Sequence, residues 1–136
     1  MAWRALTISH REWVLADRAR TVVRNAWHHC FARWDVVVCP VMPLPALPHD
    51  PRPMQERTVR IGDASLPYER MSAWAGPATM AGLPAAAMPI GVGAAGLPVG
   101  VQAIGAQFDD RTTIAFARLC GEAFGGFVAP PSCRDA

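Results

Sequence analysis

Six prolines fall within a fourteen-residue stretch, from Pro40 to Pro53, and this stretch restricts the fold more than any other feature of the sequence. A proline has no backbone N–H to donate and a φ fixed at about −65°, so it interrupts helices and central strands. We therefore expect residues 40–53 to form an extended connector inside a single unit that spans residues 1–136. Regular structure must lie on either side of this connector.

A long helix is predicted before the connector. Ser9 and Glu12 have the spacing of a capping box, in which each side chain satisfies a backbone N–H of the other residue. Apolar residues then recur every three or four positions to about Arg33, which places them in one stripe that needs a partner surface. The stripe consists of Ala16, Ala19, Val23, Ala26 or Trp27, Cys30 and Trp34, and Arg11, Arg18 and Arg24 fall mostly off it.

Two further patterns near this helix predict burial. Trp13, Trp27 and Trp34 lie near one face of the helix, so we interpret them as core packing and not as a ligand-binding cluster. Residues 35–39 form a short β-branched run that stops at Pro40, as is typical of a strand buried on both faces of a sheet. Both patterns place these residues in the core of an α/β fold.

The region after the connector favours short elements. Residues 57–61 and 64–66 indicate a small hairpin, although the Gly-Asp turn at 62–63 reverses the favoured Asp-Gly order. Residues 68–80 favour two helical pieces with a break near Gly76, because the proline that follows fits the first turn of a helix but not its interior.

The last part of the chain indicates two strands and a closing helix. Residues 85–90 and 99–104 are apolar runs joined by a glycine-rich loop, which predicts an antiparallel pair. A helix over 110–124 is predicted to begin with Asp109 as its cap and to end at Gly125.

Several polar residues could carry chemistry, and each has a simpler structural interpretation. His28 and His29 are adjacent, whereas a metal-binding pair on a helix is spaced by three or four residues. His49 and Asp50 could imitate a base with its orienting carboxylate, but no nucleophile lies nearby, so a turn contact is favoured. The glycines within 91–96 lack the Gly-Lys-Ser/Thr continuation of a phosphate loop and indicate a hairpin turn.

The remaining acids and thiols give no separate site. Asp109 and Asp110 stand at a predicted helix start, where capping and dipole roles explain them. The four cysteines, which are Cys30, Cys39, Cys120 and Cys133, have no C-x-x-C spacing, so neither a zinc site nor a redox pair is indicated. We expect buried free thiols, no metal and no cofactor.

Charge and hydropathy limit the partners. All 13 basic residues are arginines, scattered along the chain with a net charge of +2, so a nucleic-acid partner is not expected. Proline and glycine interrupt every long apolar run from Pro84 onward, and the start has no secretory leader, so we expect a cytoplasmic chain without a membrane span. Hydrophobic residues make up 51% of the chain and charged residues 18%, which predicts that additional polypeptide covers part of its surface. A homo-oligomer is a possible source of that cover.

Four blocks of sequence, taken in order, resemble the amidase signature family. They are Arg33–Ala46, Ala81–Ala85, Gly96–Gly105 and Phe108–Asp110. In that family a helix leads into a similar strand that ends in Cys-Pro, a Gly-Leu-Pro-Ala segment precedes another strand, and a Gly-Leu-Pro-Val-Gly-x-Gln segment forms the next. One Gly-Leu-Pro carries little weight, but several blocks in the family's order are specific and cover almost the whole chain.

The resemblance implies an α/β fold that is part of the amidase-signature fold, with a mixed β-sheet flanked by helices. It also implies amide-bond hydrolysis or an amidotransferase role, based on a lysine, a serine in a cis peptide and a nucleophilic serine, all upstream of the matched region. This chain has no lysine, and its four serines, at positions 9, 65, 72 and 132, are isolated. We therefore expect this chain to be the C-terminal part of an amidase and to contain no catalytic residue. Its expected partners are the missing N-terminal part of the amidase or, in the full-length enzyme, a small amide substrate.

Arg20 is the residue that the resemblance assigns to substrate binding, because the amidotransferase branch carries an arginine on the helix before the first matched strand. A solvated helix arginine is an equally good interpretation. Ser72 and Thr79 stand where that branch tends to carry a carboxylate and where the family commonly has an asparagine, which favours a general amidase. The alternative from a different class is a stand-alone, non-enzymatic interaction module.

Overall fold

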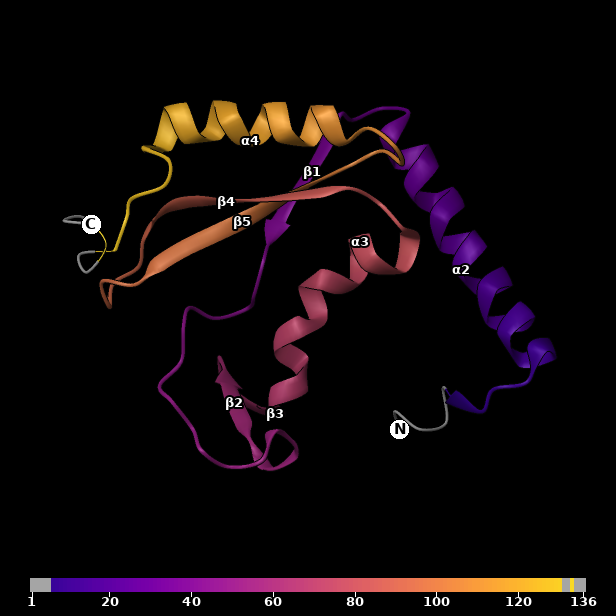
Figure 1. Ribbon diagram of the computed structural model, residues 1–136, viewed down its shortest axis with the longest axis horizontal. Helices are drawn as coiled ribbons and strands as arrows, with labels where there is room; N and C mark the ends of the chain where they lie inside the picture. The colour runs from indigo at the N-terminus through magenta and orange to yellow at the C-terminus, as the bar shows by residue number, and fades with distance from the viewer. Residues whose placement is uncertain (1–5, 131–132, 134–136) are drawn as a thin grey trace.

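The computed structural model describes residues 6–130 and residue 133 of the chain (Figure 1). Its main sheet has three strands, in the order β1 (Val36–Pro40), β5 (Pro98–Gly105) and β4 (Ala85–Val92). Both pairings are antiparallel, which confirms the antiparallel pair expected for the last two strands. The central strand is therefore β5, which forms hydrogen bonds with a neighbour on each side.

Helices lie on both faces of this sheet. Helix α4 (Asp110–Phe124) packs along one face, mainly against β4 (Figure 1). The short helices η2 (Tyr68–Ala75) and α3 (Gly76–Ala81) lie on the other side. The predicted α/β class, helices flanking a sheet, is confirmed.

The core lies where β5 meets α4 and the short helices. Ala103 and Ile104 are fully buried, and they point to opposite faces of the sheet because successive strand residues alternate. Gly105 faces α4 so closely that a Cβ there would come within 2.6 Å of Thr113 Cγ2. Thr113 itself is 2% exposed, so the sheet and α4 are in direct contact at this point.

Helix α2 (His10–Phe31) begins as predicted, and its inward face matches the predicted stripe only in part. Its capping box is complete: Glu12 N–H donates to Ser9 Oγ at 3.3 Å, and Ser9 N–H donates to a Glu12 carboxylate oxygen at 2.9 Å. The predicted stripe is confirmed at Val23, Trp27 and Cys30, which are half-buried, and is wrong at Ala16 and Ala19, which are exposed; α2 has no fully buried residue. The half-buried residues are Val14, Asp17, Arg20, Val23, Arg24, Trp27, Cys30 and Phe31.

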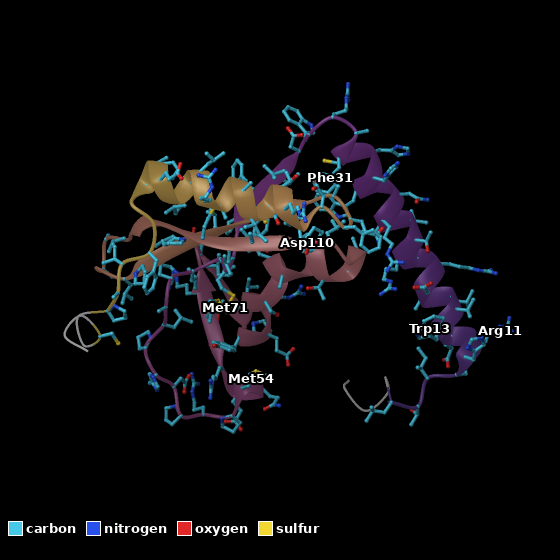
Figure 2. The ribbon with its side chains drawn as sticks, turned by 45° about the horizontal axis from the view of Figure 1, so that its top comes forward. Arg11, Trp13, Phe31, Met54, Met71 and Asp110 are labelled. Carbon is cyan, nitrogen blue, oxygen red and sulfur yellow. The ribbon has the colours of Figure 1, made fainter. Side chains whose placement is uncertain are left out.

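The tryptophan prediction is also wrong for two of the three rings. Trp13 is 52% exposed and Trp34 is 66% exposed. Figure 2 shows Trp13 near the end of α2 that lies far from the sheet. Trp27 is half-buried and stacks on Phe31, with ring centroids 5.5 Å apart. The face of α2 is set by its contact with α3, and apolar periodicity alone does not identify that contact.

Strand β1 has nearly the predicted bounds but not the predicted burial. It stands at the edge of the sheet, and Val38 is 48% exposed. The β-branched run therefore predicted the strand correctly. The prediction that both faces of this strand are buried is wrong in this structure. Pro40 is the last residue of the strand. Its missing N–H is tolerated there because no strand residue follows that would continue the hydrogen-bond ladder.

Residues 41–53 contain no helix or strand, and the short helix η1 (Met54–Glu56) follows them. Strands β2 (Thr58–Ile61) and β3 (Ala64–Pro67) then pair as the predicted hairpin. Gly62 has φ +59°, so the glycine occupies the first turn position, as in a type II′ turn, and this explains the reversed Gly-Asp order.

The remaining boundaries follow their signals, with one correction. The predicted break falls where η2 ends and α3 begins at Gly76. Gly125 ends α4 with φ +88°. Asp109 precedes α4 but does not cap its backbone: Asp109 Oδ1 instead accepts a hydrogen bond from the Thr112 hydroxyl at 2.8 Å.

Among the described residues, no helix is long and apolar enough to cross a membrane. Ser132, one of the four serines considered above, lies outside the described residues.

Candidate functional site

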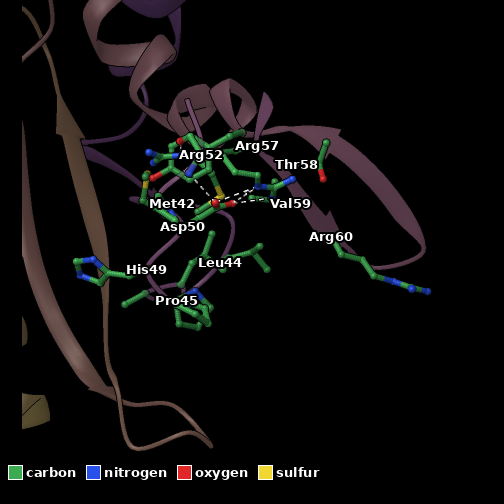
Figure 3. A pocket seen from close by; sticks show the side chains of 16 residues that line it. Met42, Leu44, Pro45, His49, Asp50, Arg52, Arg57, Thr58, Val59 and Arg60 are labelled. Atoms are coloured by element: carbon green, nitrogen blue, oxygen red, sulfur yellow. Dashed lines mark hydrogen bonds and ion pairs between the residues drawn. The ribbon is translucent and has the colours of Figure 1, made fainter. Parts of the chain in front are cut away.

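A pocket of about 790 Å³ lies between the proline-rich connector and the β2–β3 hairpin (Figure 3). Connector residues 42–52 form one wall, and residues 57–60 form the opposite wall. Tyr68 and Met71 of η2 complete the lining. The extended path of the proline-rich connector therefore leaves space for this pocket beside the hairpin.

Part of the inner surface of the pocket is apolar. Val59 and Met71 are each 5% exposed, and Met42 and Leu44 line the connector side. Tyr68 contributes an aromatic ring from the start of η2. The volume of the pocket lies within the range of about 300–1,000 Å³ that is typical of small-molecule sites.

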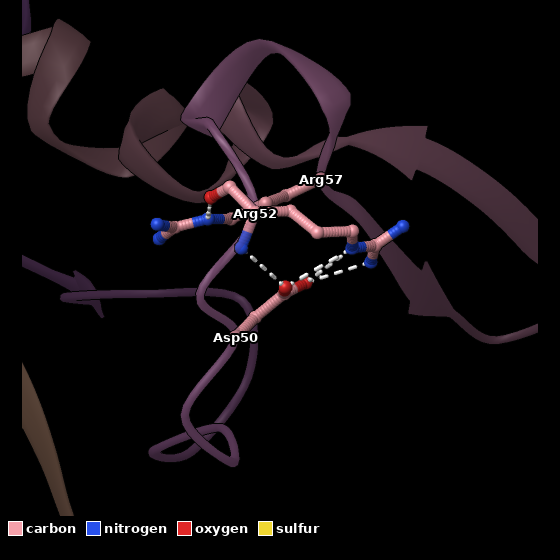
Figure 4. A network of polar contacts seen from close by, with 3 residues as sticks. All are labelled: Asp50, Arg52 and Arg57. Atoms are coloured by element: carbon pink, nitrogen blue, oxygen red, sulfur yellow. Dashed lines mark hydrogen bonds and ion pairs between the residues drawn. The ribbon is translucent and has the colours of Figure 1, made fainter.

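The polar edge of the pocket is organised around Asp50 (Figure 4). Arg52 donates from its backbone N–H and its Nε to Asp50 Oδ1, each at 3.0 Å, and from its Nη2 to Oδ2 at 2.6 Å. These hydrogen bonds from Arg52 lower the pKa of Asp50 from its usual 3.8 to about 2, and they raise the pKa of Arg52. The predicted turn contact is confirmed for Asp50, while His49 lies apart from the ion pair (Figure 3).

Arg57 is a pocket residue that the sequence patterns did not single out. Its Nε donates to the carbonyl oxygen of Arg52 at 2.6 Å, and its Cζ lies 5.6 Å from the centroid of the Tyr68 ring. Its two terminal nitrogens have no hydrogen-bond or ion-pair partner among the described residues. The only sequence signal was its place at the start of the hairpin, which does not show what it faces.

Arg20, the expected substrate-binding residue, lies on α2 and is not part of this pocket's lining. Its Nη2 forms an ion pair with Asp17 Oδ1 at 3.0 Å. Its Nε is buried and has no hydrogen-bond partner in the described part of the chain. The neighbouring Arg24, expected to lie off the inward face, donates from Nε to the Ala81 carbonyl oxygen at 3.1 Å and so joins α2 to α3.

The other candidate residues have local structural roles. Ser9 belongs to the capping box, and Ser72 Oγ donates to the Glu69 carbonyl oxygen at 2.9 Å. His28 and His29 are exposed, and no group of three or more metal-ligating side chains occurs among residues 6–130 and 133. The glycine-rich loop forms the predicted turn between β4 and β5, where Gly93 N–H donates to the Leu97 carbonyl oxygen at 2.8 Å.

The cysteines only partly match their prediction. Cys30, Cys39 and Cys120 are half-buried free thiols, whereas Cys133 is exposed. Burial raises the pKa of the Cys39 thiol, and a hydrogen bond with the Gln102 side chain offsets part of that rise.

The family model described as Amidase matches residues 3–114. The chain belongs to the amidase family. It is 35% identical over 115 residues to a glutamyl-tRNA(Gln) amidotransferase subunit of Archaeoglobus fulgidus, a match that covers 83% of this chain and 22% of that protein. The resemblance seen in the four sequence blocks is therefore confirmed, and the chain corresponds to a part of an amidase.

Solved structures show the same fold. A crystal structure of an amidase superposes with a TM-score of 0.75 and is 23% identical, and the match covers 90% of this chain and 27% of that one. A glutamyl-tRNA(Gln) amidotransferase subunit from Thermotoga maritima gives a TM-score of 0.55 at 27% identity, over 75% of this chain and 21% of its own. The chain spans 21% to 27% of the length of these structures.

The amidase blocks meet in space at Gln102. This residue belongs to the Gly-Leu-Pro-Val-Gly-x-Gln block, and its Nε2 donates to the carbonyl oxygen of Pro40 at 3.0 Å, the proline of the Cys-Pro block. A second bond runs to the carbonyl oxygen of Trp74 at 2.8 Å. Gln102 is 7% exposed, so the donor of both bonds is shielded from water. The amide thus has a structural role that the sequence resemblance alone did not assign.

Proposed function

We propose that the chain is the C-terminal part of an amide-bond hydrolase, that it contributes sheet and pocket wall, and that it is inactive alone. One observation carries the last point: the chain contains no lysine. The resemblance assigns the proton acceptor of the reaction to a lysine, and arginine cannot replace it because its pKa is too high for it to become neutral. A general amidase is favoured over an aminoacyl-directed amidotransferase, because Ser72 and Thr79 replace the expected carboxylate and asparagine.

An activity assay tests this proposal directly. The 136-residue chain should release no aniline-type product from a simple aryl amide above the rate in buffer. Turnover by the purified chain that disappears when all four serines are changed to alanine would overturn it, because the chain would then contain its own nucleophile. Turnover that survives those four changes points to a contaminating enzyme or to other chemistry, and a mock purification separates these two outcomes.

The coding sequence upstream of Met1 gives an independent test. A lysine followed by a glycine- and serine-rich segment in the same frame, or in a neighbouring gene, supports an amidase of which this chain is one part. Unrelated sequence in both places counts against that interpretation. A separate polypeptide that supplies the N-terminal part should restore aryl amide hydrolysis when mixed with the chain.

Within that complete enzyme we propose that Arg20 contacts the substrate. The support is its half-buried position and the buried Nε that lacks a partner in the described structure, since such a group gains most from a bound acceptor. Arg20→Gln should raise KM in the reconstituted enzyme, with a smaller change in kcat. Arg18→Gln, at an exposed position on the same helix, is the matched control and should leave both values unchanged.

The alternative is a non-enzymatic interaction module, which exposed apolar residues on α2 favour. Leu15 is 54% exposed and Val22 is 70% exposed, and no residue of α2 is fully buried. Sedimentation and thermal unfolding of the purified chain discriminate between the two: a cooperatively folded monomer or dimer supports the module, and an aggregated chain supports the fragment. A cytoplasmic setting and a homo-oligomer remain predictions from the sequence in either case.

A further inference from the structure

The pocket beside the hairpin contains an arginine that forms no ion pair among the described residues. Its lining includes three arginines, Arg52, Arg57 and Arg60, and one carboxylate, Asp50. Asp50 is bound by Arg52 through both carboxylate oxygens. Arg60 extends away from the other lining residues, toward solvent and toward Asp63 (Figure 3). Arg57 is therefore the pocket arginine that forms no ion pair among the described residues, although its charge also helps to lower the pKa of Asp50.

The surroundings of Arg57 hold its guanidinium in place. The bond from Nε to the Arg52 carbonyl oxygen fixes one edge of the group, and the Tyr68 ring covers it at 5.6 Å. Figure 4 shows its terminal nitrogens on the opposite side of Arg52 from Asp50. A guanidinium held in this way presents two parallel N–H donors, the geometry that matches a carboxylate.

The rest of the lining restricts the size and charge of the ligand. Val59 and Met71 are 5% exposed, and with Leu44 they belong to the apolar part of the pocket wall. Such walls favour a ligand with a hydrocarbon body and disfavour a small, fully hydrated anion. Asp50 stays ionised close by, because its pKa is lowered to about 2, and its negative charge disfavours a second negative charge on the ligand.

We propose that this pocket binds a monocarboxylate with an apolar body, whose carboxylate oxygens accept hydrogen bonds from the terminal nitrogens of Arg57. The hydrocarbon body lies against the apolar walls. Because the lining residues alone supply these contacts, the site binds such a ligand whether or not the chain takes part in amide hydrolysis.

The test compares two ligands of the same shape. Hexanoate and hexanamide have the same hydrocarbon body and differ in charge, and each is titrated into the 136-residue chain by calorimetry or by two-dimensional NMR. Hexanoate should bind at least about tenfold more tightly than hexanamide, because a charge-assisted pair is lost in the amide. Equal affinities would overturn the proposal, as would the absence of hexanoate binding to the folded chain.

Two variants locate the interaction. Arg57→Gln should reduce hexanoate affinity to that of hexanamide, whereas Arg60→Gln should leave it unchanged, because Arg60 borders the same pocket but points away from it. Equal losses in both variants would show diffuse attraction to positive charge and would contradict a site at Arg57. Arg57→Lys keeps the charge but not the paired donors, and an intermediate affinity is expected.

Folding and binding are separated by a second measurement. Thermal unfolding of each variant shows whether it is folded, and hexanoate-induced shifts of the Arg57 Nε–H signal in the unchanged chain report the contact without any substitution. Shifts confined to residues outside the pocket would overturn the proposal even if affinity is measurable. Because no step of this test measures turnover, its result is independent of the aryl amide assay.

Discussion

The side-chain amide of Gln102 donates a hydrogen bond to the backbone carbonyl oxygen of Trp74, across 2.8 Å and between the central strand β5 and helix η2. The same nitrogen donates to the Pro40 carbonyl oxygen at the end of β1, at 3.0 Å. One buried side chain therefore connects three segments that are far apart in the sequence.

Removing this amide should destabilise the chain. Gln102→Leu keeps most of the side-chain volume but takes the donor away from two carbonyl oxygens, and we expect a loss of about 2 kcal/mol in the free energy of unfolding. Urea unfolding followed by tryptophan fluorescence measures it. Gln107→Leu, at an exposed position in the next loop, is the control, with an expected change within about 0.5 kcal/mol. Similar values for the two variants would contradict a role for the Gln102 bonds.

The contact between the sheet and α4 gives a second prediction. Gly105→Ala would place its Cβ 2.6 Å from Thr113 Cγ2, so we expect a loss of about 1–3 kcal/mol from overpacking. Thr113→Ser removes the methyl group that would clash and keeps the hydroxyl that donates to the Asp110 carbonyl oxygen. The double variant should therefore be more stable than additivity of the two single changes predicts.

A glycine of α4 provides the comparison for that prediction. Gly121 lies within the helix, and a Cβ there would meet its nearest atom at 3.7 Å, an ordinary contact distance. Gly121→Ala should increase stability by about 0.5–1 kcal/mol, because alanine is a better helix former. Thermal unfolding of both alanine variants under the same conditions shows whether packing or backbone conformational freedom determines the change in stability of each variant. A gain for Gly105→Ala would contradict the close approach of Thr113.

Local signals predicted the elements of this fold better than their burial. Ser9 with Glu12 indicated the start of α2, and Gly76 and Gly125 marked boundaries, because capping and backbone conformation depend on neighbours in sequence. The inward face of α2 was predicted only in part, at Val23, Trp27 and Cys30. Arg24 lies on that face because it bonds to the Ala81 carbonyl oxygen, a contact across 57 positions that no local pattern contains.

In the candidate pocket, too, local contacts could be predicted from the sequence and long-range contacts could not. Asp50 and its turn could be foreseen, since a short acidic side chain often accepts a hydrogen bond from the backbone two residues later. The meeting of Arg57, Tyr68 and the connector could not, because it depends on where an irregular segment passes over the hairpin. The four blocks of family resemblance supplied what the physical patterns did not, namely the class of protein.

The half-buried thiol of β1 gives a third prediction. Burial raises the pKa of Cys39, so less of it is thiolate at a given pH, and thiolate is the reactive form. Iodoacetamide near pH 8 should modify Cys39 more slowly in the folded chain than in the chain unfolded by urea, as measured by mass spectrometry of the digested protein. The folded-to-unfolded difference should shrink as the pH is raised above the usual pKa of a thiol, because the thiolate fraction then rises in the folded chain as well. Equal rates in the two states would contradict both the burial of this thiol and the shift in its pKa.

The ion pair of the pocket makes stability depend on pH in a defined direction. The pKa of Asp50 is about 2 in the folded chain, below its usual 3.8, because Arg52 donates hydrogen bonds to the ionised form. A carboxyl whose pKa is lowered by folding stabilises the folded state at pH values above its usual pKa, and this contribution is lost as the pH falls from about 4 to about 2. Asp50→Asn should therefore flatten the fall of the thermal midpoint over that range.

The size and origin of this effect can be separated from acid unfolding in general. Both side chains are partly exposed, at 55% for Arg52 and 29% for Asp50, so solvent screens the pair and added salt should reduce the difference between Asp50→Asn and the unchanged chain. Asp63→Asn is the matched control, because Asp63 is fully exposed and 3.9 Å from Arg60. If the acid profile of Asp50→Asn matches that of Asp63→Asn, the Arg52 pair does not set the response. If only Asp50→Asn flattens the profile, and does so less at high salt, the connector is held at this edge of the pocket by a titratable ion pair.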